Sequence, residues 1–360
     1  MDIKSISTRM ATEDDAHLPA YDHTKLSAVN TCPTYGIIRY SHHKKMPGSY
    51  RQMALEAGTA SHEGFAAVRM YQYLFHTETF KHHTANAQYQ GVKLFGKERY
   101  QAMLDTLSDG ATDRTNCINF VVEAVELCGF YDDISDNKRT LSNITESLIS
   151  YIDAYDMKRY PIWIRDKDDP KTDIGIEIAF DIVVSITLEE PHVAREPYHP
   201  YEFRFTGKLD GLHMDKGDLI IQENKSGSRL DDAWLSQWVL SHQITGYCVA
   251  SATFTGLPCT KAMVMGMKLP IGRVPAEGIR TEKVPRGHML VTKWAEWFLH
   301  STLIERKYID NILEAPMYTH SCNRYFSSCS FLPFCAADNK EEKELILSEL
   351  EIDEWSPLHE

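Results

Sequence analysis

The chain has 360 residues, of which 43% are apolar and 25% are charged, as in a globular protein long enough to bury a core. Its formal net charge of −13 argues against tight, non-specific nucleic-acid binding, although a local basic groove can coexist with an acidic remainder. It has neither a secretion signal nor an uncharged apolar run of about 18 residues, so we expect a cytoplasmic protein without a membrane partner.

The first half of the chain is predicted to be mainly helical. Residues 1–20 are polar and aperiodic, which predicts a flexible N-terminal arm. Residues 21–74 are predicted to hold a short helix over 27–40 and a longer one over 50–74. Residues 75–165 carry no catalytic pattern and are interpreted as a helical insertion.

One short stretch within this half is basic. It comprises His42, His43, Lys44 and Lys45, with Arg51 nearby. Lys and Arg can neutralise phosphates, so the stretch is a candidate groove, but an ordinary solvated loop explains it equally well.

The second half of the chain changes to a strand-rich pattern. Segments rich in Ile, Val and Phe alternate with turns and helices, which predicts an α/β fold. Lys, Glu and Leu dominate the last residues, which predicts an acidic helix or tail. The predicted strands cover residues 176–188, 201–214, 219–224 and 261–269, and the predicted helices cover 230–254 and 288–312.

Two carboxylates and a lysine form a candidate catalytic group in these strands. Asp210 lies inside an apolar strand-like run, where Asp is disfavoured. Glu223 and Lys225 are two residues apart on the next strand, so both side chains face the same way. If the turn between the strands pairs them, Asp210 comes close to Glu223. The alternative is a surface ion pair between Glu223 and Lys225 beside a hairpin.

Such a group suits the hydrolysis of phosphodiesters. Carboxylate oxygens hold Mg²⁺ or Mn²⁺. The metal ion lowers the pKa of bound water and offsets the charge of the transition state, and a lysine can position the attacking water.

Three cysteines near the C-terminus form a second candidate site. Cys322, Cys329 and Cys335 are separated by six and five residues. Because a cytosolic chain keeps its thiols reduced, a soft metal site is favoured over disulfides. A [4Fe–4S] cluster needs a fourth thiolate, for which Cys32 is the best candidate. Zinc and a chance grouping are the alternatives.

The motifs in their order resemble the PD-(D/E)XK nuclease superfamily, specifically its RecB-like exonuclease branch with an iron–sulfur cluster, of phage or CRISPR-associated type. The resemblance runs from about residue 27 to 335, with 75–165 unmatched. Cys322 and Cys329 are separated by six residues, which departs from the Cys-x-x-Cys spacing frequent in that branch. The motifs are Cys32, His62 in a Gly-x-x-x-His pattern, Asp210, Glu223-x-Lys225, Gln243-x-x-x-Tyr247 and the three C-terminal cysteines.

The resemblance implies a role for each matching residue. Asp210, Glu223 and His62 would bind Mg²⁺ or Mn²⁺, together with the backbone carbonyl of Asn224. Lys225 would promote attack. A helix-surface histidine is the ordinary alternative for His62. The resemblance adds Gln243 and Tyr247, which share a helix face beside the active site; the alternative is a tyrosine that packs in the core. It also adds Glu177, which would support the metal; the alternative is an ordinary acidic residue.

The resemblance also implies the fold. We expect a restriction-endonuclease-like α/β core with a central mixed sheet flanked by helices over residues 166–315. A cysteine segment over 316–339 would hold the [4Fe–4S] cluster with Cys32. Residues 340–360 would form the acidic tail.

The function implied is a metal-dependent DNA exonuclease in recombination, repair or phage genome metabolism. Its partner would be single-stranded DNA or duplex ends, with recombination or replication proteins as further partners. The alternatives are a non-catalytic DNA-binding or scaffold subunit with a degenerate site, and a nuclease that processes CRISPR spacers.

Overall fold

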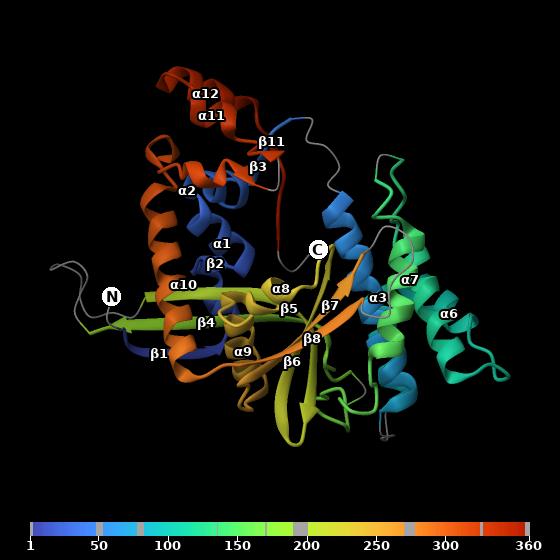
Figure 1. The fold of residues 1–360 in the computed structure, drawn as a ribbon. Coiled ribbons are helices and arrows are strands. Elements are labelled where there is room, and N and C mark those ends of the chain that lie inside the picture. Colours follow the sequence, from blue (N-terminus) through green and yellow to red (C-terminus); the bar gives the residue numbers. More distant parts are fainter. Residues whose placement is uncertain are drawn as a thin grey trace. The chain divides into compact units, whose positions relative to one another are not determined.

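The computed structural model describes residues 3–47, 53–77, 83–134, 136–169, 171–189, 201–269, 278–324 and 327–356 (Figure 1). The chain divides into two compact units, each described here by itself. Unit 1 comprises Met1–Arg51, Phe180–Gly207 and His288–Glu360, and unit 2 comprises Gln52–Ala179 and Lys208–Gly287.

The strands form a mixed seven-stranded sheet flanked by helices, so the predicted α/β class is confirmed. Its order is β1-β4-β5-β6-β7-β8, with β2 paired to β5. Strands β6 and β7 are parallel, whereas β5–β6 and β7–β8 are antiparallel. The strands are β1 Ile3–Met10, β2 Ala20–Tyr21, β4 Ile176–Leu188, β5 Tyr201–Asp215, β6 Asp218–Gly227, β7 Lys261–Lys268 and β8 Ile279–Pro285.

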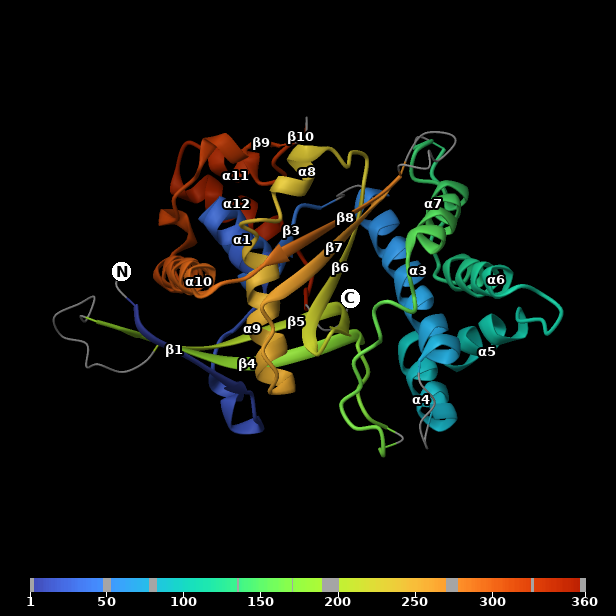
Figure 2. The same cartoon turned by 60° about the horizontal axis from the view of Figure 1, so that its bottom comes forward.

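Helices cover both faces of β6 and β7 within unit 2 (Figure 2). Helices α3 and α7 share a large apolar core with Ile220 of β6 and Met263 and Met265 of β7. Helix α9 packs against β6 and β7 as well, and Figure 2 shows it on the other side. The helices of unit 2 are α3 Met53–His76, α4 His83–Phe95, α5 Lys97–Asp105, α6 Asp113–Glu126, α7 Leu141–Ala154, α8 Asp232–Ser236 and α9 His242–Thr255.

Successive side chains of β6 point to opposite faces, as in any strand. Gln222 bonds to a residue of α3, and Asn224 bonds to a residue of α7. Glu223 and Lys225 therefore point to the α9 side, where the Lys225 ammonium lies 5.9 Å from the centre of the Trp238 ring.

Unit 1 has a smaller core. The aromatic rings of Tyr21, Phe203 and Phe298 pack together between β2, β5 and α10, which spans His288–Tyr308. A second apolar cluster joins Ile37 and Ile38 to Phe331 and Phe334. The other elements of unit 1 are short. They are η1 Glu13–His17, α1 His23–Thr31, α2 Pro33–Gly36, the π-helix η2 Ile37–Ser41, β3 Lys44–Lys45, η3 Ile312–Glu314, η4 Thr319–Ser321, β9 Asn323–Arg324, β10 Ser327–Ser328, α11 Leu332–Ala336, α12 Lys340–Glu349 and β11 Glu351–Ile352.

Several predicted elements differ from the structure. The predicted loose arm over 1–20 is wrong, because β1 pairs with β4 along most of its length. The helix predicted over 27–40 is broken at Cys32, since Pro33 lacks an amide hydrogen and begins a new helix. The helix predicted over 230–254 is two helices, α8 and α9, and β8 was not predicted.

The helical character predicted for residues 75–165 is confirmed for the described part, which holds α4, α5, α6 and α7. None of the described helices combines the length and the apolar composition needed to span a membrane.

Candidate functional site

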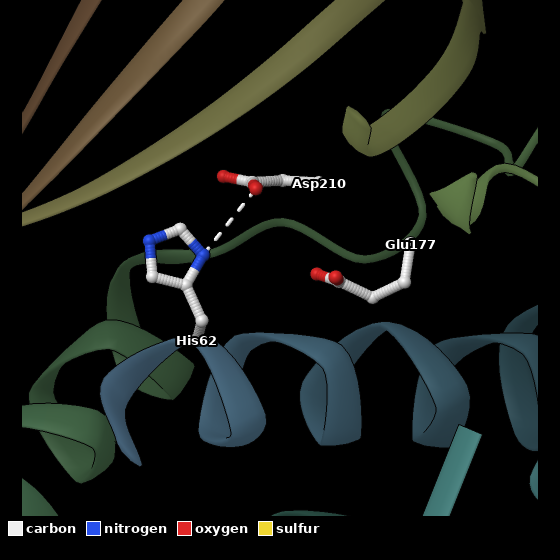
Figure 3. Close-up of side chains that lie close together, drawn as sticks. All are labelled: His62, Glu177 and Asp210. Atoms are coloured by element: carbon white, nitrogen blue, oxygen red, sulfur yellow. Dashed lines mark ion pairs between the residues drawn. The ribbon is translucent and has the colours of Figure 1, made fainter. Parts of the chain in front are cut away.

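Three side chains of unit 2 converge on one point. His62 comes from α3, Glu177 from the start of β4 and Asp210 from β5, and one ligand atom from each lies within 4.8 Å of the others. Figure 3 shows the imidazole and the two carboxylates turned toward one another. The His62 Nδ1 and Asp210 Oδ1 atoms are 3.3 Å apart.

Asp210 lies where β5 and β6 part. The ladder of paired residues ends at Gly211 and Gln222, one residue short of Asp210. The backbone N–H of Asn224 donates instead to Asp210 Oδ2, at 2.6 Å. The carboxylate thus satisfies a strand amide that the ladder leaves open.

Glu223 and Lys225 complete what we call the acidic site, together with His62, Glu177 and Asp210. The Lys225 Nζ atom lies 2.6 Å from Glu223 Oε1. Glu223 is 1% exposed. Its other oxygen, Oε2, is buried and has no hydrogen-bond partner in the part of the chain that the structure describes. A buried carboxylate oxygen without a donor is costly unless a cation or water satisfies it.

The acidic site shifts the pKa values of its own groups. Burial, and then the charge of Asp210, raises the pKa of Glu177 and of Glu223 to about 7. Burial opposes ionisation of Asp210 too, but His62, Lys225 and the Asn224 amide together lower its pKa. Asp210 in turn raises the pKa of His62 despite the burial of that ring. Asp210 is therefore the carboxyl that ionises most readily, and its charge opposes ionisation of the two glutamates.

Glu177 has a left-handed backbone, with φ of +48°. Residues other than glycine rarely adopt this conformation, and it costs free energy. The conformation begins β4 and turns the carboxylate toward His62 and Asp210 (Figure 3). Glu177 Oε2 also pairs with Lys208 Nζ at 2.7 Å.

The sequence prediction missed Arg69, which supports all three strands of the acidic site. Arg69 is 1% exposed and lies seven residues after His62 on α3. Its guanidinium donates to the carbonyls of Gly175 and Leu212, both at 3.0 Å. These carbonyls lie two residues from Glu177 and from Asp210 on their chains. The signal available in the sequence was an arginine between Val68 and Met70, within an apolar run of the helix.

Arg69 also reaches β6. Its guanidinium donates to Gln222 Oε1 at 2.8 Å and to the Tyr155 hydroxyl at 2.6 Å. Gln222 precedes Glu223, so the same cation is tied to each strand that carries a carboxylate of the site. The bonds of Nη1 and Nη2 tie the three strands to one side chain, while Arg69 Nε is buried without a partner among the described residues.

The side chain of Asn224 points away from the acidic site. Its Oδ1 atom accepts from the Tyr151 hydroxyl at 3.0 Å and from Gln222 Nε2 at 3.1 Å. The metal role predicted for Asn224 concerns its backbone carbonyl and stays a prediction.

Gln243 and Tyr247 contact each other on α9. Gln243 Nε2 donates to the Tyr247 hydroxyl at 3.2 Å. Because α9 packs against β6 and β7, the pair belongs to the helix that covers the strand of Glu223 and Lys225. Its part in catalysis stays a prediction.

The four predicted cysteine ligands all belong to unit 1, and we call them the cysteine group. Cys32 lies between α1 and α2 and is 6% exposed. The Cys329 amide donates to the Cys322 carbonyl at 2.7 Å, and Cys335 lies in α11. The Thr34 hydroxyl donates to the Ala315 carbonyl at 3.1 Å, which ties the segment of Cys32 to the C-terminal segment.

The thiols of the cysteine group act on one another. Burial, and then Cys32, Cys329 and Cys322, raises the pKa of Cys335 to about 11. The pKa of Cys329 is also raised by burial and by Cys32 and Cys322. Neighbouring thiols oppose each other's ionisation, and a bound cation removes that opposition.

Three of the four remaining cysteines have buried side chains. Cys117, Cys248 and Cys259 are buried, while Cys128 is partly exposed. Cys248 and Cys259 both lie 3.8 Å from the Lys261 carbonyl.

The sequence matches no known protein-family profile and no characterised protein. Among solved structures, the chain is similar to the crystal structure of SSO0001, with 12% identity and a TM-score of 0.27. The alignment covers 46% of this chain and 61% of that chain. A similarity of this extent supports no conclusion about fold or function.

Proposed function

We propose that this chain is a metal-dependent DNA nuclease of the PD-(D/E)XK type, whose acidic site hydrolyses phosphodiester bonds. The observation that carries the proposal is the convergence of His62, Glu177 and Asp210 within 4.8 Å, with the Glu223–Lys225 ion pair on the strand next to that of Asp210. An ordinary surface ion pair would not bury Glu223 almost completely. The substrate proposed is single-stranded DNA or duplex ends, in recombination, repair or phage genome metabolism.

The acidic site fits a divalent cation. Two carboxylates and an imidazole offer hard and borderline ligand atoms, a set that suits Mg²⁺ and Mn²⁺, with the imidazole favouring Mn²⁺. The Glu223 Oε2 atom is buried without a donor among the described residues, and Glu177 and Glu223 both have a pKa raised to about 7. A cation would relieve both penalties, because it favours the ionised carboxylates.

The cation would be held by His62, Glu177, Asp210 and Glu223, and when bound it would supply Lewis-acid stabilisation of a phosphate. The Asn224 amide orients Asp210 through its bond to Oδ2. Lys225 keeps its ammonium beside Glu223, where Nζ can donate to a phosphate oxygen or to the attacking water. Arg69 fixes the spacing of the strands from which the ligands project.

Lys225→Ala tests this assignment. We expect the cleavage rate of end-labelled single and double strands, with Mg²⁺ or Mn²⁺, to fall about 10³-fold, because one preorganised donor to the transition state is lost. DNA binding in EDTA should stay within about twofold. Lys261→Ala is the matched control, since Lys261 forms an exposed pair with Asp218. Cleavage by Lys225→Ala at the wild-type rate would refute the nuclease.

We further propose that the cysteine group holds a [4Fe–4S] cluster. Four thiols from Cys32, Cys322, Cys329 and Cys335 are the ligand set that such clusters use. The Cys329 amide donates to the Cys322 carbonyl, and Cys329 and Cys335 pack against the same apolar cluster as Ile37, in the segment that follows Cys32. Protein purified without oxygen should be brown, with about four iron and four sulfide per chain. A colourless protein that contains zinc would replace the cluster with the alternative metal.

A further inference from the structure

The basic stretch of the sequence is paired with the acidic C-terminal segment of the chain. Strand β3, which consists of Lys44 and Lys45, forms an antiparallel ladder with β11. Lys45 lies opposite Glu351, and its Nζ atom is 4.0 Å from Glu351 Oε2 and 3.7 Å from Asp353 Oδ1. Two carboxylates thus lie over one lysine.

Arg39 and Lys44 also have acceptors from the C-terminal part of the chain. Arg39 pairs with Asp353 Oδ2 at 2.6 Å, and its guanidinium also donates to the Asp353 carbonyl at 3.3 Å. Lys44 Nζ donates to the carbonyl of Leu347 at 2.8 Å. Arg39 and Lys45 therefore have acceptors within residues 351–353, whereas the acceptor of Lys44 lies in α12, which spans Lys340–Glu349.

The contact also includes an aromatic pair. The rings of Tyr40 and Trp355 are 5.0 Å apart and nearly perpendicular, at 81°. The Arg39 guanidinium lies 5.5 Å from the centre of the Tyr40 ring. Between the cations and the rings, the Asp353 amide donates to the His43 carbonyl at 2.7 Å, and the Trp355 amide lies 3.4 Å from His43 Nδ1.

We propose that Arg39, Tyr40, His43, Lys44 and Lys45 form a binding surface for single-stranded nucleic acid, and that residues 351–355 cover it by imitating that ligand. Cations along a strand and an aromatic ring for stacking are the two features by which proteins bind single strands. The C-terminal segment offers the matching groups: carboxylates in place of phosphates and an indole in place of a base.

The cover is weak enough for a nucleic acid to displace. Its ion pairs are partly exposed, with 34% of the Asp353 side chain and 51% of the Glu351 side chain accessible. Exposed ion pairs contribute little to stability and are screened by salt. The two-residue strand β11 adds few backbone bonds. A polyanion that brings several phosphates at once gains the release of its counterions, which two carboxylates cannot match.

Binding of a fluorescein-labelled oligothymidylate of about 20 nucleotides tests the surface, in EDTA so that no cleavage is involved. The full chain carrying Glu351→Gln and Asp353→Asn should bind about tenfold more tightly than the wild type, and its affinity should fall more steeply with salt. The matched control carries Glu341→Gln and Glu344→Gln on α12, which change the net charge equally but leave the covering contacts in place. Equal gains in both double variants would refute the proposal.

Two further measurements locate the effect. Adding Lys44→Glu and Lys45→Glu to the first double variant should abolish the gain, and a gain that persists would refute the surface. In the wild type, the Asp353 amide should exchange its hydrogen faster when the oligonucleotide saturates the protein, because the cover leaves. Unchanged exchange would contradict displacement. Polyglutamate of equal charge should compete poorly, since it lacks bases, and equal competition would exclude a nucleic-acid surface.

The proposal does not depend on the nuclease assignment. If Lys225→Ala cleaves normally while the uncovered variant still binds tightly, the nuclease assignment fails and the surface stands. If cleavage depends on Lys225 but the Glu351→Gln, Asp353→Asn variant binds the oligonucleotide no more tightly than the wild type, the nuclease assignment stands and the binding surface fails.

Discussion

The acidic site and the cysteine group differ in what supports them. The ligands of the acidic site come from long elements, α3, β4, β5 and β6, and unit 2 packs α3 and β6 around a large apolar core. The cysteines of unit 1 lie on or beside short elements, of which α1 with nine residues is the longest, and an apolar cluster packs against Cys329 and Cys335. The scaffold of unit 2 therefore shapes the acidic site, whereas ligation at the cysteine group would have to order the segments around it.

The largest expected effect is the loss of a cysteine ligand. Cys335→Ser should remove the cluster and lower the free energy of unfolding of unit 1 by about 4 kcal/mol, because ligation of distant cysteines closes a long loop and contributes directly to folding. Cys128→Ser is the control, since Cys128 lies outside the group and is partly exposed. Calorimetry with iron analysis measures both.

The acidic site should respond differently to the removal of the proposed cation. EDTA should shift the melting of unit 2 by only about 2–4 °C, since the scaffold is already packed. If EDTA unfolded unit 2 while Cys335→Ser left unit 1 intact, the acidic site would be the one whose surroundings depend on its ligand.

Arg69 tests why the acidic site holds its shape. Arg69→Met should lower the free energy of unfolding by about 2–3 kcal/mol, because the Gly175, Leu212 and Gln222 acceptors lose their buried donor. It should also weaken Mn²⁺ binding about 10–100-fold, as the loss of a group that orients metal ligands does.

A second variant, Arg69→Lys, separates the orientation of the metal ligands from a purely structural role of Arg69. Arg69→Lys keeps a cation but cannot reach all four acceptors, so it should restore part of the stability and little of the Mn²⁺ affinity. If affinity and stability recovered together, Arg69 would support the fold alone and not the metal ligands.

Much of the fold could be predicted from the sequence, and the reasons differ between elements. The strands at 176–188 and 261–269 are rich in buried apolar side chains, and the structure confirms them within one residue. Strand β1 lies at an edge of the sheet and is made mostly of polar residues, so its composition resembled that of a loop. No local pattern marked β8 either, because it is mostly polar and lies at the other edge.

The candidate site was predictable only in part. A strand period of two places Glu223 beside Lys225, and the structure brings both near Asp210. The positive φ of Glu177 and the four bonds of Arg69 come from tertiary packing, which spacing along the chain does not encode. The roles of these residues in catalysis stay predictions.

The raised pKa values of Glu177 and Glu223 should make stability and cation binding change with pH in opposite directions. The pKa of Glu177 and Glu223 is raised to about 7 from an ordinary value of 4.5, so the folded chain holds protons that the unfolded chain has lost. The corresponding stability is complete below pH 4.5 and is lost as the pH rises through 7. A cation needs the ionised forms, so Mn²⁺ affinity should rise up to about tenfold per pH unit between 6 and 8.

Titration calorimetry of the Mn²⁺ complex in buffers of different ionisation enthalpy measures the protons released. Glu223→Gln should release fewer protons than the wild type and flatten the pH dependence. An affinity that is constant between pH 6 and 8 would mean that neither glutamate is a ligand.

The smallest expected effect concerns the backbone of Glu177. Glu177→Asn should raise the free energy of unfolding by about 1 kcal/mol, because asparagine adopts positive φ more readily than glutamate. The same substitution shortens the side chain and removes its charge, so Mn²⁺ affinity should fall. Stability would then increase while cation binding weakens.

A matched control separates backbone strain from the loss of the ligand. Lys216 has a φ of +55° in the turn between β5 and β6, and its side chain is exposed. Lys216→Asn should gain similar stability and leave Mn²⁺ affinity unchanged. If Glu177→Asn gained stability without losing affinity, the left-handed backbone at Glu177 would be incidental to the site. Opposite changes in the two quantities would show that unit 2 holds a strained residue in place for the cation.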